Sequence, residues 1–171
     1  YELGNDLGNL VMRCVKLSLK KIGKSISAPN GYDNKLYIDL EKAYAQADKY
    51  MLNLAYDRAL EPIWGYIKKI NAYLNESEPW KQGEEDALHT IMYTALDNLS
   101  NATAMLKPYM PKVAETIEEQ LGCASSFNDF ESHKVFSLTD KEALFPKIER
   151  TEKEVFLLDL KVGEIVSAQQ H

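Results

Sequence analysis

Five stretches of this chain carry apolar residues at alternating steps of three and four, and this spacing restricts its fold more than any other feature. Such steps place apolar side chains along one face of an α-helix. The stretches are residues 3–22, 36–56, 56–74, 84–106 and 111–122. Because each has one apolar face to bury, we predict an all-α fold, a bundle of five helices.

Start and stop residues separate these helices. The segment "SAPNGYDN" (27–34) is rich in turn-forming residues and predicts a loop. Pro111 suits the first turn of the fifth helix, and Gly122 suits its C-terminal cap. Residues 75–83 are the predicted connector between the third and fourth helices.

The pattern changes after Gly122. Residues 123–150 have the composition of a loop, and we expect their apolar side chains to fold back onto the bundle as a wrapping segment. Further on, Leu158, Leu160 and Val162 alternate with polar residues, and a period of two is typical of a β-strand. We therefore predict a helical domain over residues 1–150 and a short β-prone C-terminal tail over residues 151–171.

Composition and absent motifs exclude several classes of protein. No apolar run approaches the roughly 20 residues that a membrane-spanning helix needs. The 2 cysteines and 3 histidines are scattered, so we expect neither a metal site nor a disulfide framework, and a cytoplasmic location fits. No phosphate-binding loop, dinucleotide fingerprint or nucleophile motif occurs. The prediction is a binding module without catalytic residues, metal or cofactor.

The first residues, "YELGNDLGNL", contain neither an initiator Met nor a signal-peptide pattern. We expect them to continue from a preceding part of a longer chain.

Charge is unevenly distributed along the chain. The formal net charge of −6 argues against a protein that holds nucleic acid mainly through phosphates. Within residues 1–24, however, five cationic residues outnumber two acidic ones. Helical spacing places four of the cations on one face, namely Arg13, Lys16, Lys20 and Lys24. The three lysines are candidate phosphate contacts, although an ordinary solvated face has the same pattern.

The connector "NESEPWKQ" (75–82) holds a tryptophan directly after a proline, where helix packing does not require one. An indole on a short connector can stack on an unpaired RNA base, an interaction worth roughly 1–3 kcal/mol. Other interpretations stay open for the residues nearby. Trp80 can fill a gap between helices, Asn9 can face solvent, and Arg13 can pair with Asp6 or Glu2 on its own helix.

Four short runs resemble a known family. They are "NDLGNLVMR" (5–13), "NAYLNESEPWK" (71–81), "LKPYMPKVAETIEEQLG" (106–122) and "LFPKIE" (144–149). In this order they resemble the anticodon-binding domain of methionyl-tRNA synthetases, over about residues 1–150. The resemblance implies an all-α bundle that recognises the CAU anticodon of methionine and initiator tRNAs. It implies that Trp80 stacks on the first anticodon base and that Asn9 and Arg13 address a base together.

The same resemblance implies that the chain is the C-terminal recognition part of a methionine–tRNA ligase. The signatures of the catalytic domain do not occur here, so ATP and Mg²⁺ are expected only in the parent enzyme, with the catalytic domain as a partner. The run "LDLKVGEIV" (158–166) resembles the opening strand of an OB-fold tRNA-binding extension. Two alternatives stay open: the anticodon domain of another class I synthetase, and a helical scaffold that binds a protein through Trp80.

Overall fold

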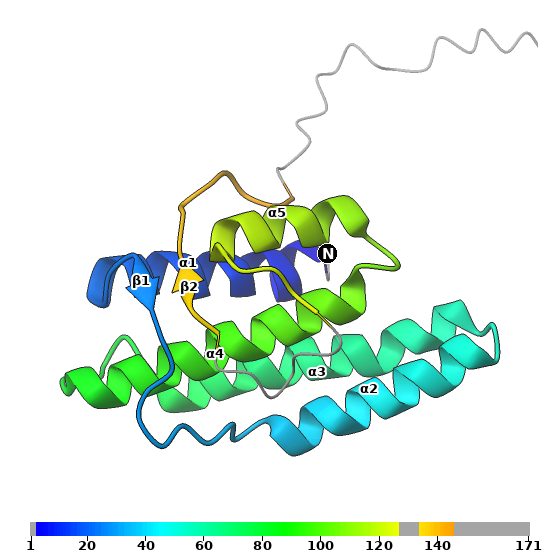
Figure 1. The fold of residues 1–171 in the computed structure, drawn as a ribbon, viewed down its shortest axis with the longest axis horizontal. Coiled ribbons are helices and arrows are strands. Elements are labelled where there is room, and N and C mark those ends of the chain that lie inside the picture. Colours follow the sequence, from blue (N-terminus) through cyan, green and yellow to red (C-terminus); the bar gives the residue numbers. More distant parts are fainter. Residues whose placement is uncertain (1–2, 127–133, 146–171) are drawn as a thin grey trace, which may run out of the picture.

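The computed structural model describes residues 3–126 and 134–145, which form a helical bundle (Figure 1). A π-helix, η1 (Leu3–Gly8), leads directly into α1 (Asn9–Lys21). The other helices are α2 (Tyr37–Leu52), α3 (Tyr56–Ser77), α4 (Glu85–Leu106) and α5 (Pro111–Leu121). Two short strands are present, β1 (Ser25–Ile26) and β2 (Phe136–Ser137). The prediction of an all-α, five-helix bundle is confirmed.

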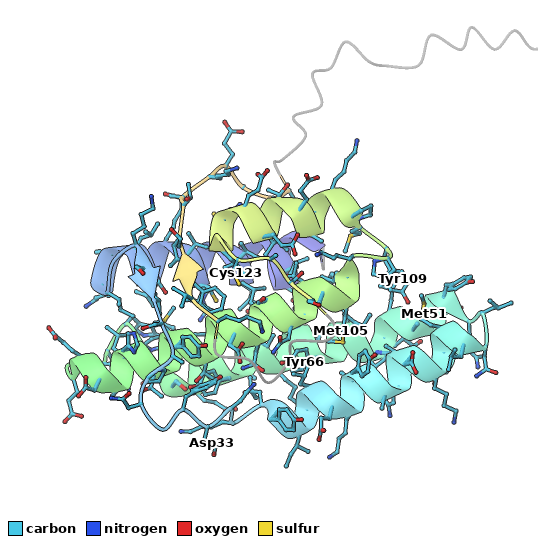
Figure 2. The ribbon with its side chains drawn as sticks, viewed as in Figure 1. Asp33, Met51, Tyr66, Met105, Tyr109 and Cys123 are labelled. Carbon is cyan, nitrogen blue, oxygen red and sulfur yellow. The ribbon has the colours of Figure 1, made fainter. Side chains whose placement is uncertain are left out.

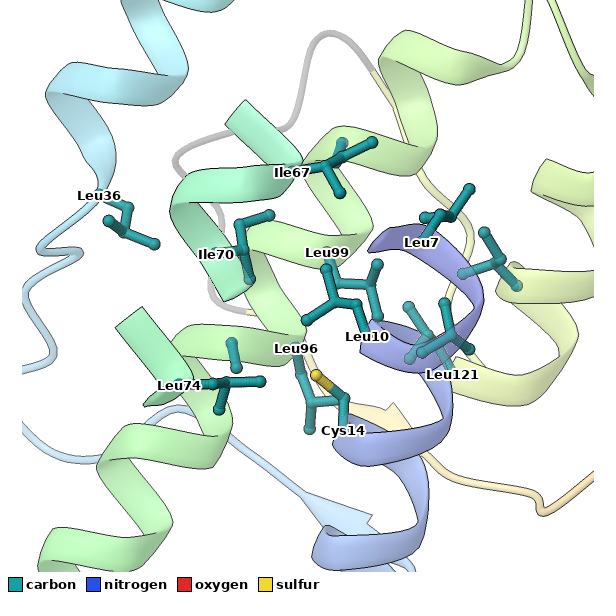
Figure 3. Packing of buried hydrophobic residues seen from close by; sticks show 14 of the residues in the cluster. Leu7, Leu10, Cys14, Leu36, Ile67, Ile70, Leu74, Leu96, Leu99 and Leu121 are labelled. Carbon is teal, nitrogen blue, oxygen red and sulfur yellow. The ribbon is translucent and has the colours of Figure 1, made fainter. Parts of the chain in front are cut away.

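Helix α4 forms the centre of the bundle. Every residue from 92 to 106 is buried, so this helix is covered on all sides. Figure 3 shows Leu96 and Leu99 of α4 packed beside Leu10 and Cys14 of α1 and close to Ile70 of α3. The apolar stripe of α4 predicted one buried face, but the polar residues between the stripe positions are buried as well.

These buried polar residues of α4 hold two distant segments. Asp97 Oδ1 accepts from Lys134 Nζ at 2.9 Å, and the side chains of this ion pair are only 4% and 3% exposed. Lys134 Nζ also donates to Asn101 Oδ1 at 2.6 Å. Asn98 exchanges hydrogen bonds of 2.9 and 3.1 Å with Asn34. The network therefore attaches both the segment before α2 and the segment after α5 to the central helix.

Two tyrosine hydroxyls complete this network. Tyr32 donates to Asp97 Oδ2 at 3.2 Å, and Tyr66 donates to Asn98 Oδ1. Burial, and then the negative charge of Asp97, raise the pKa of both hydroxyls well above their ordinary range. Both tyrosines therefore keep their protons at neutral pH and act as donors.

The prediction of a wrapping segment is confirmed for residues 134–145. Strand β2 pairs antiparallel with β1, with Ser137 opposite Ser25 and Phe136 opposite Ile26. Phe136 and Ile26 are fully buried, so this pair closes one side of the core. Two-residue strands are too short to show a period in the sequence, and this pair was not predicted. The β-prone tail over residues 151–171 and its boundary at residue 150 lie outside the described residues.

Two helix boundaries differ from the prediction. Helix α2 ends at Leu52, and Leu54 has a left-handed φ of 58° and is 73% exposed, although the predicted pattern placed it on the buried face. Helix α3 continues to Ser77, so the connector to α4 is residues 78–84. A residue before proline is disfavoured in helical conformation, and Pro79 therefore sets the end of α3.

A cavity of about 290 Å³ lies between α2, α3 and α4, beside the turn between α2 and α3. Met51, Met105 and Tyr109 line it together (Figure 2), and the Tyr109 hydroxyl donates to Met51 Sδ at 2.9 Å. The turn between α3 and α4 lies at the opposite end of the bundle, the end to which α1 runs (Figure 1).

Candidate nucleic-acid interface

Helix α1 presents a cationic face to solvent. Its opposite face, which includes Leu10 and Cys14, is buried in the core. Helical periodicity therefore turns Arg13, Lys16 and Lys20 outward, where the two lysines are exposed and Arg13 is half-buried. The predicted cationic face is confirmed for these three residues.

Lys24 does not belong to this face. Helix α1 ends at Lys21, and Gly23 has a φ of 131°, which redirects the chain before Lys24. The side chain of Lys24 is exposed beside β1, and its carbonyl accepts from the Leu138 N–H at 2.8 Å. The prediction of four cations on one helical face is wrong at this position, because glycine tolerates a positive φ that ends the helix.

The turn between α3 and α4 holds Trp80 at the surface. Glu78 adopts a left-handed conformation with φ 42° and ψ 56°, and Pro79 is buried. The Lys81 N–H closes the turn by donating to the Glu78 carbonyl at 2.8 Å. Trp80 is 44% exposed. The structure therefore does not support the alternative in which Trp80 fills a gap between helices.

Arg13 connects α1 to this turn. Its Nη2 donates to Asn75 Oδ1 on α3 at 2.8 Å, and its Cζ lies 5.5 Å from the centre of the Trp80 ring. That distance is typical of a cation–π contact. Arg13 is thus held by α3 and by the connector at once, which brings two predicted site residues together.

The predicted residues also share a hollow of about 380 Å³ that is open to solvent. Its lining is Met12, Arg13, Lys16, Leu17, Lys20 and Trp80. The charged residues of this lining are all cationic, and the aromatic ring is Trp80. The sequence predicted four of the six residues, because each carries a charge or an aromatic group in a recognisable position.

Asn9 and Asn75 flank this arrangement. Asn9 is the first residue of α1 and is exposed, one turn before Arg13 on the same helical face, but it does not line the hollow. Asn75 was missed by sequence reasoning. It lies in the run that also contains Trp80, yet its partner Arg13 is 62 residues away, and residue spacing does not reveal such a pair.

Asp6 was a candidate partner of Arg13 but pairs with α3 instead. Its Oδ2 accepts from Trp64 Nε1 at 3.2 Å and lies 3.9 Å from Lys68 Nζ. Its carbonyl oxygen accepts from Asn71 Nδ2 at 2.9 Å. The other candidate partner, Glu2, lies outside the described residues.

The thiol that follows Arg13 in the chain is not an activated nucleophile. Burial raises the pKa of the Cys14 thiol, next to the site, to about 12, and the opposing effect of Arg13 is smaller. Such a thiol is protonated and unreactive at neutral pH. Within residues 3–126 and 134–145 no group of three or more metal-ligating side chains comes together. The described helices include none that is long and apolar enough to cross a membrane.

Residues 33–165 match the family described as the anticodon-binding domain of tRNA ligases. The chain belongs to this family. The match contains α2 to α5 and Trp80, whereas α1, with Asn9 and Arg13, precedes it.

Curated relatives of this chain extend the match to the first helix. The methionine–tRNA ligase of Bacillus subtilis (strain 168) is 30% identical over 172 residues, 92% of this chain and 26% of the relative. That of Clostridium acetobutylicum is 29% identical over 182 residues, 99% of this chain and 28% of the relative. The chain thus spans about a quarter of the length of the curated relatives it matches. These matches confirm the resemblance inferred from the four runs.

A solved structure confirms the fold. The apo form of Mycobacterium tuberculosis methionyl-tRNA synthetase superimposes with a TM-score of 0.78 at 23% identity, covering 88% of this chain and 33% of that chain. The same enzyme bound by methionyl-adenylate superimposes with a TM-score of 0.76.

Proposed function

We propose that this chain recognises the CAU anticodon loop of methionine tRNAs, including the initiator, as part of a methionine–tRNA ligase. The observation that carries the proposal is the hollow in which Trp80 lies beside Arg13, Lys16 and Lys20. The family match supports an anticodon-binding role, and the names of the relatives support methionine as the amino acid.

In this proposal the first anticodon base stacks on the exposed indole of Trp80. RNA sequence is recognised mostly in single-stranded loops, where splayed bases expose both their faces and their hydrogen-bonding edges. The amide of Asn9 and the guanidinium of Arg13 address those edges, since an amide offers a donor and an acceptor and a guanidinium offers a planar set of donors. Lys16 and Lys20 hold phosphates beside the stacked base, and Lys24 is a more distant phosphate contact.

The negative net charge of the chain is compatible with this binding mode, because the cations that matter are local. If Lys16, Lys20 and Lys24 contact two or three phosphates, log K for RNA should fall against log salt with a slope of about −1.4 to −2. Recognition that rests on stacking and base edges needs no larger electrostatic contribution.

The rest of the parent enzyme supplies the chemistry. We propose that the catalytic domain lies in the part of the relatives' length that this chain does not span, and that ATP and Mg²⁺ bind there. The chain then contributes recognition of the tRNA, in the cytoplasm where translation takes place.

The proposal is tested by titrating the chain with a CAU anticodon stem-loop and following tryptophan fluorescence. A second stem-loop differs only in the first anticodon base. We expect quenching with the CAU loop and weaker binding of the altered loop. Trp80→Ala should weaken binding by about 1–3 kcal/mol, which is roughly 5- to 150-fold in Kd, without lowering the melting temperature.

Tyr56→Ala is the matched control, because Tyr56 is an aromatic residue that is 51% exposed at the end of the bundle beside the α2–α3 turn. It should bind both stem-loops like the unchanged chain. Equal affinity for the two stem-loops would contradict CAU recognition. Failure of both to bind at low salt would favour the alternative of a protein-binding scaffold.

A further inference from the structure

Asp6 binds α3 through both its side chain and its backbone. The carboxylate accepts from Trp64 Nε1 at 3.2 Å, and the carbonyl oxygen accepts from Asn71 Nδ2 at 2.9 Å. The Asp6 side chain is 26% exposed, so the carboxylate is partly shielded from water. Asp6 lies within η1, the π-helical turn, and π-helical turns are often found at functional sites.

The α3 residues that bind Asp6 lie on the same helix as Asn75, the partner of Arg13 in the candidate RNA site. Trp64, Asn71 and Asn75 are spaced by seven and four residues, which places them along one face of α3. Asp6 of η1 and Arg13 of α1 are seven residues apart on two helices that are continuous in the chain. These two helices lie beside that face of α3, with Asp6 held at Trp64 and Asn71 and with Arg13 held at Asn75.

We propose that Asp6 is a positioning residue for anticodon recognition. Asp6 fixes η1 and α1 against α3. In this position of the two helices, Arg13 reaches both Asn75 and the Trp80 ring. This role rests on the proposed function, because it acts through Arg13 and touches no RNA itself.

The direction in which RNA affinity changes when Asp6 is replaced distinguishes a positioning role from a purely electrostatic one. Asp6 is acidic, so its removal makes the chain less negative, and long-range electrostatics alone would tighten RNA binding. Positioning predicts the opposite, because a first helix that has lost its bond to Trp64 shifts against α3 and no longer holds Arg13 at the turn. Glu119→Ala gives the effect of charge alone, since Glu119 lies on α5 and pairs with the exposed Lys141.

The test measures the Kd of the CAU stem-loop and of the altered loop for a set of variants of the whole chain. Asp6→Ala removes the bond from Trp64 but keeps the backbone bond from Asn71. It should weaken CAU binding by about tenfold, the size expected for losing one hydrogen bond to a charged acceptor, and should reduce the preference for CAU. Asp6→Asn keeps an acceptor oxygen for Trp64 and should restore most of the affinity. Glu119→Ala should leave Kd unchanged or lower it slightly.

A double-mutant cycle tests whether Asp6 acts through Arg13. If it does, Asp6→Ala combined with Arg13→Ala should bind no more weakly than Arg13→Ala alone. If the two losses add in full, or if Asp6→Ala tightens binding as Glu119→Ala does, the positioning role is overturned.

A measurement without RNA keeps this inference separate from the proposed function. The chain has 2 tryptophans, Trp64 and Trp80, so a proton–nitrogen NMR spectrum should contain two indole N–H signals. Asp6→Ala should shift the Trp64 signal, which loses its acceptor, and also the Trp80 signal, because Arg13 moves relative to that ring. A shift of Trp64 alone would refute positioning even if no RNA bound. If both signals shift but the chain binds the two stem-loops with equal affinity, CAU recognition is refuted and the positioning of Arg13 by Asp6 is not.

Discussion

Lys134→Met should destabilise the fold strongly, because it breaks the ion pair that attaches the wrapping segment to α4. Lys134 Nζ lies 2.9 Å from Asp97 Oδ1, and the two side chains are 3% and 4% exposed, respectively. Replacing the lysine leaves a buried carboxylate without its cation and removes the donor to Asn101 Oδ1. Breaking a buried pair in this way costs about 3–5 kcal/mol, since the remaining charge keeps its desolvation penalty.

The remaining donors to Asp97 offset only part of this loss. Tyr32 and Asn34 donate to Asp97 Oδ2 at 3.2 and 3.4 Å, and both are neutral donors. The net loss should therefore stay close to the cost of breaking a buried ion pair.

Urea unfolding at pH 7 measures this prediction. For a chain of this length, about 3–5 kcal/mol corresponds to a loss of roughly 6–20 °C in melting temperature. Lys141→Met is the matched control, because it breaks the exposed pair with Glu119 and should cost less than about 1 kcal/mol. Asp97→Leu combined with Lys134→Met should recover much of the stability. The reasoning fails if Lys134→Met costs no more than Lys141→Met.

Three further predictions concern other parts of the bundle. Gly122→Ala should destabilise by about 2–4 kcal/mol in urea unfolding, because φ is 60° and an added Cβ would lie 2.2 Å from the Ser137 carbonyl oxygen; an unchanged midpoint would contradict this. Burial raises the pKa of Glu118, but hydrogen bonds led by that from Lys107 outweigh it and hold the pKa below 4.5. The pair of Lys107 and Glu118 therefore stabilises the folded chain fully above about pH 4.5, and this stabilisation is lost as the pH falls through the lower pKa of the folded state. The free energy of unfolding of Lys107→Met should therefore differ from that of the unchanged chain more at pH 6 than at pH 3. Cys14, with a pKa of about 12, should resist thiol labelling at pH 8 until the chain unfolds, and fast labelling of the native chain would contradict its burial.

The helices could be predicted from the sequence because each one buries an apolar face along its length. The spacing of its apolar residues therefore shows the helix without knowledge of its partners. The ends were harder to predict, since they depend on single residues. Pro79, and not the polar Asn75, ends α3, and Gly23 ends the cationic face before Lys24. The apolar Leu54 fitted the period of α2, but the chain had already left the helix.

The same distinction holds for side-chain contacts. Trp80 could be predicted at the surface because its place after Pro79 removes it from any helix face. The pairs Arg13–Asn75 and Lys134–Asp97 span 62 and 37 residues, and only the packing of α1 and of the wrapping segment brings their partners together. A cation in a sequence does not show its partner: Asp6, one of the two open candidates for Arg13, lies close in the chain but binds Trp64 and Lys68 instead.

The contact between Arg13 and Trp80 constrains how a base can stack. The guanidinium lies over the Trp80 ring, so a base either takes the place of Arg13 or uses the opposite face of the indole. Displacement would break the 2.8 Å hydrogen bond to Asn75, and with it a contribution of about 0.5–1.5 kcal/mol. Stacking on the opposite face keeps that bond and places the indole between a cation and a base. Within the proposed function the second arrangement is therefore favoured. In it the indole separates Arg13 from the stacked base, so the base edge that the guanidinium addresses belongs to a neighbouring base.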